Sequence, residues 1–228
     1  MKQHLLYPLI IVFILLGCTD INRKNFKSEG TIEYRIDYPP ALKEESIATF
    51  LPEKMTTFFK KDHFKIKLTG SFNLYNLEYL SRSGGDSCFT VFKVLGKSMF
   101  YPLKKKETLF LYNDLGHPKV KIYKDSIKNI AGFDCQKAVL SFPKPKTPKM
   151  TTYFTKELGV KNPNRNTPFS TIPGVLMEFS LNYQDISLKL IAEKFNNEQV
   201  ESNEFMLPSD YETTTQKEME DIIASLLQ

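Results

Sequence analysis

Apolar and polar residues alternate along much of this chain, which is the period of a β-strand with one buried face. Residues 31–38, TIEYRIDY, put isoleucine and tyrosine on one face and charged side chains on the other. Residues 64–68, FKIKL, repeat the pattern with lysine at the polar positions. Similar stretches predict further strands at 55–59, 74–80, 88–95, 108–112, 119–123, 135–142 and 151–156. The pattern predicts many antiparallel strands with one face in contact with water.

The clearest predicted hairpin lies late in the chain. Residues 175–183 place five large side chains on one face, namely Val175, Met177, Phe179, Leu181 and Tyr183. Residues 184–185 turn the chain, and 186–193 then alternate again. Pro173 and Gly174, just before the hairpin, are typical of a type II turn. We therefore expect this hairpin to contribute an apolar lining to the inside of the sheet.

Residues 215–227 carry the signals of an amphipathic helix. Thr215 and Glu218 have the spacing of a capping box, and apolar residues follow at helical spacing: Met219, Ile222, Ile223, Leu226 and Leu227. This stripe predicts docking onto the protein's own sheet, with a membrane or a partner as the alternatives. Residues 41–50 predict a second, shorter helix. The expected fold class is mainly β, of the α+β kind.

The N-terminus predicts export and lipidation. A short positive segment is followed by an apolar stretch of about a dozen residues, too short for a transmembrane helix and typical of a signal peptide. Residues 15–18, LLGC, resemble a bacterial lipobox, in which Cys18 takes the acyl chains that anchor a protein in a bilayer. The alternative is an ordinary signal peptide with an incidental cysteine. The predicted divisions are 1–17 signal peptide, 18–29 lipidated tether and 30–228 a single domain.

By the same resemblance to bacterial lipoproteins, the residue after the lipidated cysteine bears on which membrane is reached. An aspartate there favours the inner membrane in enterobacterial lipoproteins, and this chain has Thr19. We therefore expect a lipid-anchored protein of the cell envelope, at the outer membrane. The formal net charge of +5 is spread over many segments, whereas nucleic-acid binding needs a concentrated basic face. No nucleic-acid partner is expected.

After lipidation of Cys18, Cys88 and Cys135 remain as a pair in an oxidising compartment. A disulfide between them would close a loop of about 47 residues and contribute roughly 2–4 kcal/mol. Two buried free thiols are the alternative. The two histidines outside the signal peptide, His63 and His117, have no metal-ligand spacing, and no G-x-S-x-G is present. We expect no metal, no cofactor, no catalytic residues and no enzymatic activity.

Three segments together resemble the GLPGLI family of secreted Bacteroidetes proteins and a related domain with a LolA/LolB-like lipoprotein-carrier fold. They are residues 129–142 (NIAGFDCQKAVLSF), 151–158 (TTYFTKEL) and 169–179 (FSTIPGVLMEF). Pro173 and Gly174 match the naming motif outright, and residues 205–212 resemble the close of the family's domain. The resemblance implies a strongly curved antiparallel sheet, an incomplete barrel of LolA-like type, whose apolar concave face is partly covered by helices. It implies no enzyme activity.

Two functions fit this expectation. In the first, the half-barrel binds or carries a lipid, an acyl chain or another hydrophobic ligand in its concavity. In the second, side chains fill the concavity, and the protein is a structural or interaction module for an envelope protein partner. A lined cavity of a few hundred cubic ångströms would favour the carrier. A filled core beside an exposed apolar patch would favour the partner.

Overall fold

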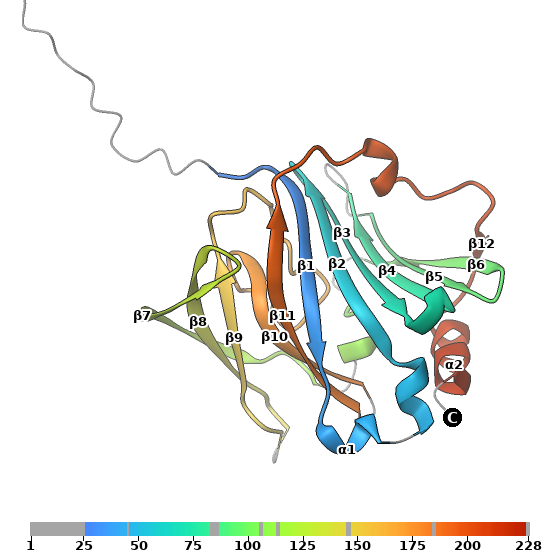
Figure 1. Ribbon diagram of the computed structural model, residues 1–228, viewed down its shortest axis with the longest axis horizontal. Helices are drawn as coiled ribbons and strands as arrows, with labels where there is room; N and C mark the ends of the chain where they lie inside the picture. Colours follow the sequence, from blue (N-terminus) through green and yellow to red (C-terminus); the bar gives the residue numbers. More distant parts are fainter. Residues whose placement is uncertain are drawn as a thin grey trace, which may run out of the picture.

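The structure, a computed structural model, describes residues 26–44, 46–82, 87–104, 107–112, 115–144, 147–183 and 186–226. Cys18, the predicted signal peptide and most of the predicted tether lie outside these residues. Twelve strands of the described chain form one sheet, in the order β12-β6-β5-β4-β3-β2-β1-β11-β10-β9-β8-β7 (Figure 1). Their bounds are β1 Glu29–Asp37, β2 Pro52–Lys60, β3 His63–Gly70, β4 Tyr75–Ser81, β5 Cys88–Val94, β6 Lys97–Leu103, β7 Lys119–Ile130, β8 Phe133–Ser141, β9 Met150–Thr155, β10 Val175–Tyr183, β11 Ile186–Asn196 and β12 Glu212–Thr213.

Apart from β12, which pairs in parallel with β6, the sheet consists of two antiparallel meanders, β1–β6 and β7–β11, joined where β1 pairs with β11. Across this junction Tyr34 lies opposite Ala192, and both are buried on the concave side. The predicted hairpin is confirmed, because β10 and β11 pair Phe179 with Leu190 and Leu181 with Leu188. The sheet curves around its buried face without closing (Figure 1). The mainly β, incomplete-barrel fold class is therefore confirmed.

The helical elements are few and short. They are α1 Pro40–Lys43, α2 Gln216–Leu226 and the 3-10 turns η1 Ser46–Phe50, η2 Ser71–Asn73, η3 Phe110–Tyr112 and η4 Ser202–Phe205. The helix predicted at 41–50 is divided between α1 and η1. The strand predicted at 108–112 is wrong, because that apolar run forms η3 and packs inside the concavity. β6 was not predicted, since Pro102 interrupts its alternation, but the strand tolerates proline near the sheet edge.

The C-terminal helix α2 forms and docks as predicted. Thr215 Oγ1 accepts from the Glu218 amide at 3.2 Å, and Glu218 Oε2 accepts from the Thr215 amide at 3.0 Å, which completes the capping box. Met219 is fully buried against Tyr75, Phe92 and neighbouring side chains of β4–β6. The side chains of Leu226 and Leu227 lie outside the described part. No helix in the described residues is long and apolar enough to cross a bilayer.

Of the two alternatives for the cysteines, the structure has free thiols. Cys88 and Cys135 are both buried and unbridged. Tyr79 Oη lies 3.4 Å from Cys88 Sγ, and the Cys135 thiol donates to the Phe133 carbonyl at 3.4 Å. Burial, with the charge of Glu157 adding to it, raises the pKa of Cys135 to about 12. Such a thiol stays protonated and behaves as a small apolar side chain.

Candidate functional site

The predicted apolar lining faces the interior of the half-barrel. Val175, Met177, Phe179 and Leu181 are each no more than 6% exposed and belong to the main core. The side chain of Tyr183 lies outside the described residues. The ladder between β9 and β10 shifts by one residue between Leu176 and Glu178. Two buried hydroxyls donate to the backbone carbonyls before and after this bulge. Tyr34 donates to the Leu176 carbonyl at 2.8 Å, and Thr152 donates to the Glu178 carbonyl at 2.7 Å.

Two connecting segments fill the space in front of this lining. We call η3 together with residues 158–174 the plug. Phe169 at its centre is 1% exposed. Its ring meets the rings of Tyr112 and Phe179 edge-on, with centroids 5.9 Å away in each case. Leu158 and Ile172, from the same segment, are also buried in the main core. The concave face is therefore covered by the chain's own side chains.

Hydrogen bonds hold the plug in place. Asn164, which is buried, donates through Nδ2 to the carbonyls of Ile172 and Gly174 at 3.0 and 2.8 Å. The Leu109 amide, directly before η3, donates to the Asn166 carbonyl at 2.8 Å and so connects the two segments. The Tyr79 hydroxyl of β4 donates to the Arg165 carbonyl at 3.1 Å. These bonds satisfy polar groups that the irregular backbone would otherwise leave buried and unpaired.

The turn predicted at Pro173 and Gly174 is not of type II. Gly174 does not have the positive φ that a type II turn requires at its third position. Its amide instead donates to the Ile172 carbonyl at 3.0 Å. A Cβ at Gly174 would stand 2.3 Å from the Thr155 carbonyl oxygen. Glycine is needed here because β9 passes directly beside the backbone, so the type II turn is a wrong prediction.

The cavities that the described residues line inside the half-barrel are small. One cavity of about 30 Å³ lies between Phe169, Val175, Phe179 and residues of β1–β3. Another, of about 50 Å³, lies between η3, Phe179, Leu181 and residues of β2–β5. Sites for drug-sized ligands occupy roughly 300–1,000 Å³, and each of these cavities has room for little more than a water molecule or two. The concavity is filled in this conformation.

Large apolar side chains are instead exposed along one end of the sheet. β2 begins, β3 ends, β4 begins and β5 ends at this end, as the pairs Pro52 with Gly70 and Tyr75 with Val94 show. The connections there carry Phe50, Phe72, Leu74 and Leu95, which we call the apolar rim; their exposed fractions are 41%, 81%, 37% and 77%. Phe72 and Leu95 have φ of 54° and 47°, a conformation that bulky side chains rarely adopt. The rim is a set of exposed apolar side chains at one end of the sheet, two of them in strained turns.

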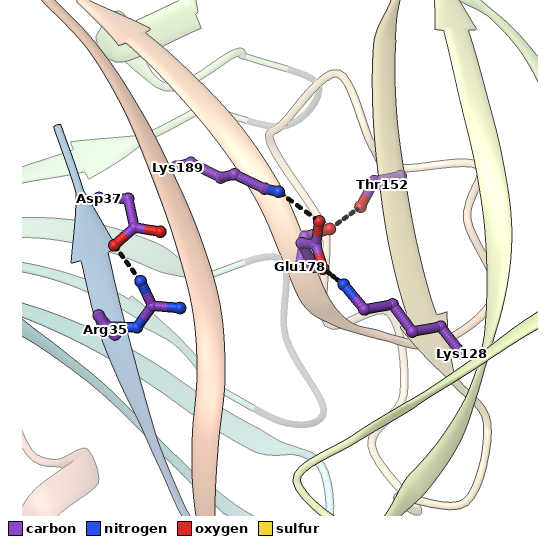
Figure 2. Close-up of polar contacts among 6 residues, drawn as sticks. All are labelled: Arg35, Asp37, Lys128, Thr152, Glu178 and Lys189. Carbon is purple, nitrogen blue, oxygen red and sulfur yellow. Dashed lines mark hydrogen bonds and ion pairs between the residues drawn. The ribbon is translucent and has the colours of Figure 1, made fainter. Parts of the chain in front are cut away.

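The convex side carries a row of lysines and tyrosines. Tyr123, Lys137, Tyr153 and Glu178 lie opposite one another across β7, β8, β9 and β10. Figure 2 shows the Glu178 carboxylate between Lys128 and Lys189; its contact with Lys189 Nζ is 2.6 Å long. Lys128 also lies over the Tyr153 ring, 5.3 Å from its centroid. We call this row, with its adjoining lysines, the lysine–tyrosine face.

Glu178 gives the convex side a testable pH dependence. Burial alone would raise the pKa of Glu178, but hydrogen bonds from Lys128 and Lys189 outweigh it and hold the pKa below 4.5. A depressed folded-state pKa stabilises the fold above the ordinary carboxyl range, and this contribution is lost as pH falls through the folded pKa. We expect Glu178→Gln to lower the free energy of unfolding by about 1–2 kcal/mol at neutral pH. The difference from wild type should shrink in acid.

Urea unfolding at a series of pH values measures this difference. Glu193→Gln is the matched control, because Glu193 pairs with Arg35 on the same sheet but is 55% exposed at its side chain. We expect it to change the stability by less than about 0.5 kcal/mol at any pH. A Glu178→Gln difference that does not depend on pH would contradict the assignment of a depressed pKa.

Within the described residues, no group of three or more His, Cys, Asp and Glu side chains could hold a metal ion. The site that the sequence predicted is an apolar surface, and the structure assembles it. The sequence did not predict that Phe169 and Tyr112 would cover it. Phe169 lies in a segment without strand or helix periodicity, and Tyr112 lies in residues 108–112, which the sequence wrongly predicted as a strand. No local signal therefore indicated where either side chain would pack.

These features define the class to which the chain belongs by structure: an open, curved antiparallel half-barrel with a C-terminal helix and a self-filled concavity. No family model matches the chain and no curated protein matches its sequence, so the likeness to the GLPGLI family stays a prediction. Solved structures do resemble it. An uncharacterized conserved protein from Thermus thermophilus is 8% identical with a TM-score of 0.46, over 84% of this chain and 93% of that one.

Two further solved structures also resemble the chain. MucB of Pseudomonas aeruginosa, in complex with MucA, is 8% identical with a TM-score of 0.36; the match covers 82% of this chain and 58% of MucB. A putative outer membrane lipoprotein-sorting protein domain from Vibrio parahaemolyticus is 11% identical with a TM-score of 0.31, over 78% and 88% of the two chains. The chain thus spans little more than half of MucB. At these identities the likeness concerns the course of the chain alone.

Proposed function

We propose that this protein is a non-catalytic interaction module of the cell envelope, anchored through acylated Cys18, that binds a protein partner. The observation that carries the proposal is the filled concavity. The plug seats Phe169 against Phe179, and the two cavities that adjoin Phe179 measure about 30 and 50 Å³. A carrier of acyl chains needs several times this volume. Binding a lipid there would require the whole plug to leave the core. A pocket of about 650 Å³ lies elsewhere, between β6, β12 and α2, and its lining includes the charged residues Lys97, Glu212 and Asp221.

The apolar rim supplies the contact surface in this proposal. Phe72 and Leu95 project from neighbouring turns at one end of the sheet, and both are more than three-quarters exposed. Large apolar side chains that stay in water are costly, and contiguous ones mark interaction sites on soluble domains. Aromatic anchors of this kind carry much of the energy in protein interfaces. Their left-handed backbone conformations fix how the side chains are presented.

Native mass spectrometry tests the choice between the two functions. The domain, begun at Thr19 and purified from a bacterial periplasm without detergent, should show the mass of the bare polypeptide. It should also retain no phospholipid or fatty acid that is added and then removed by gel filtration. A stoichiometric lipid adduct that is released on denaturation would overturn the proposal and restore the carrier function.

Crosslinking within living cells tests the surface. A photoreactive residue at Phe72 or Leu95 should give the same single crosslinked protein, whereas Asn197, exposed beyond the end of β11 at the opposite end of the sheet, should not. Purified partner should then bind the wild-type domain and bind Phe72→Asp at least tenfold more weakly. Equal crosslinking at all three positions would contradict a specific surface.

A further inference from the structure

The two edges of the sheet differ in whether another strand pairs with them. The β6 edge is covered in part by β12, which pairs Glu212 with Met99 and Thr213 with Phe100. The other edge is β7, twelve residues long, and no strand of the described chain pairs with its outer side. An unpaired edge presents a row of backbone N–H and C=O groups that can accept another strand. The long β7 edge is therefore a template for strand addition.

The first half of β7 has two chemically distinct faces. Lys119, Lys121 and Tyr123 are exposed on the convex side, in register with Ser141, Val139 and Lys137 of β8. Val120 and Ile122 alternate with them, are half-buried and pack against the main core. After Tyr123 the ladder shifts at a bulge, so these five residues form the regular part of the edge. A strand added here would meet lysines on one face and apolar side chains on the other.

The convex face of this edge is electropositive. Lys121 and Lys137 both lie over the Tyr123 ring, 4.9 and 5.8 Å from its centroid. In the described residues, no carboxylate forms an ion pair with Lys119, Lys121 or Lys137. Glu178, the carboxylate in the same row, is already shared by two other lysines. On the hairpin itself, Asp134 accepts from Asn129 near the far turn, and Asp125 lies in the bulge.

We infer that the Lys119–Tyr123 edge binds an extended segment of a partner protein in which acidic and apolar residues alternate. Acidic side chains opposite Lys119 and Lys121 form favourable cross-strand pairs, and apolar ones extend the sheet's inner face beside Val120 and Ile122. The backbone of the segment satisfies the free edge. An anionic membrane would satisfy the lysines but neither the backbone groups nor the apolar face. This inference goes beyond the proposed function, since it concerns a surface other than the apolar rim.

Fluorescence anisotropy with short labelled peptides tests the inference on the domain begun at Thr19. A peptide of alternating glutamate and valine should bind, whereas alternating glutamate and glycine, or lysine and valine, should not. The double variant Lys119→Glu/Lys121→Glu should bind the glutamate–valine peptide about tenfold more weakly, since two favourable pairs become repulsive. The same variant should gain binding to the lysine–valine peptide, an exchange of specificity that mere misfolding could not give.

Lys93→Glu/Lys97→Glu, at exposed lysines of β5 and β6, is the matched control and should leave peptide binding unchanged. Failure of the glutamate–valine peptide to bind would overturn the inference and leave the lysines as protection of the edge against pairing. If the glutamate–glycine peptide bound as tightly as the glutamate–valine peptide, the inference would also be overturned. The same holds if phosphatidylglycerol vesicles bound and no peptide did. None of these results changes the outcome expected from native mass spectrometry or from crosslinking at the apolar rim. The proposed function is therefore judged separately.

Discussion

Replacing Phe169 with alanine is expected to lower the free energy of unfolding by about 3–5 kcal/mol, the usual cost of removing a buried aromatic ring. Phe169 is 1% exposed and its ring contacts those of Tyr112 and Phe179. The Tyr79 hydroxyl of β4 donates to the Arg165 carbonyl of the plug, and Asn164 donates to the Ile172 carbonyl within the plug. The surrounding side chains therefore cannot simply collapse into the space. The void would adjoin the existing 30 Å³ cavity. The variant should therefore become a receptor for small apolar molecules.

Urea unfolding measures the loss of stability, and the fluorescence of an added apolar probe under native conditions measures the new cavity. Phe72→Ala is the control, because Phe72 is 81% exposed and its removal should change the stability by less than about 0.5 kcal/mol. Wild type should not bind the probe in its interior. If Phe169→Ala cost less than about 1 kcal/mol, the plug would not be packed as described. Stoichiometric probe binding by wild type would show an accessible concavity.

The plug is a part of this fold that could not be predicted from the sequence. The β10–β11 hairpin could be predicted because alternation over nine residues has one periodicity and one buried face. Residues 108–112 were predicted as a strand but contain the turn η3. A short apolar run is compatible with a strand or with a buried turn, and only tertiary packing decides between them. β6 was not predicted, because proline argues against a strand. The structure tolerates Pro102 there because β6 lies next to the sheet edge.

The candidate site shows the same division. Alternation correctly placed Val175, Met177, Phe179 and Leu181 on the inner face. Whether that face is open depends on Tyr112 and Phe169. Tyr112 reaches it from a run that was wrongly predicted as a strand, and Phe169 reaches it from a loop without a pattern of its own. The lysine–tyrosine face was likewise invisible, because Tyr123, Lys137 and Tyr153 become neighbours only through the register of separate strands. The sequence therefore predicted which side chains face inward, and the structure shows what covers them.

Replacing Gly174 with alanine should lower the free energy of unfolding by about 2–3 kcal/mol, as expected for overpacking against a rigid neighbour. For a domain of this size, that loss corresponds to a fall in Tm of about 5–10 °C. The added Cβ would stand 2.3 Å from the Thr155 carbonyl oxygen and 2.9 Å from Phe154 Cδ2. The oxygen belongs to the backbone of β9, which is held between β8 and β10 and cannot yield locally. Differential scanning calorimetry measures the shift in Tm.

Gly159→Ala separates this clash from the general effect of removing a glycine. A Cβ at Gly159 would lie 3.5 Å from its nearest neighbour, an ordinary contact, and Gly159 has no positive φ. Its replacement should move Tm by no more than about 2 °C. Equal shifts at the two glycines would contradict the close approach of β9. A large shift at Gly174 alone would show that this glycine is needed where the plug ends and β10 enters the core.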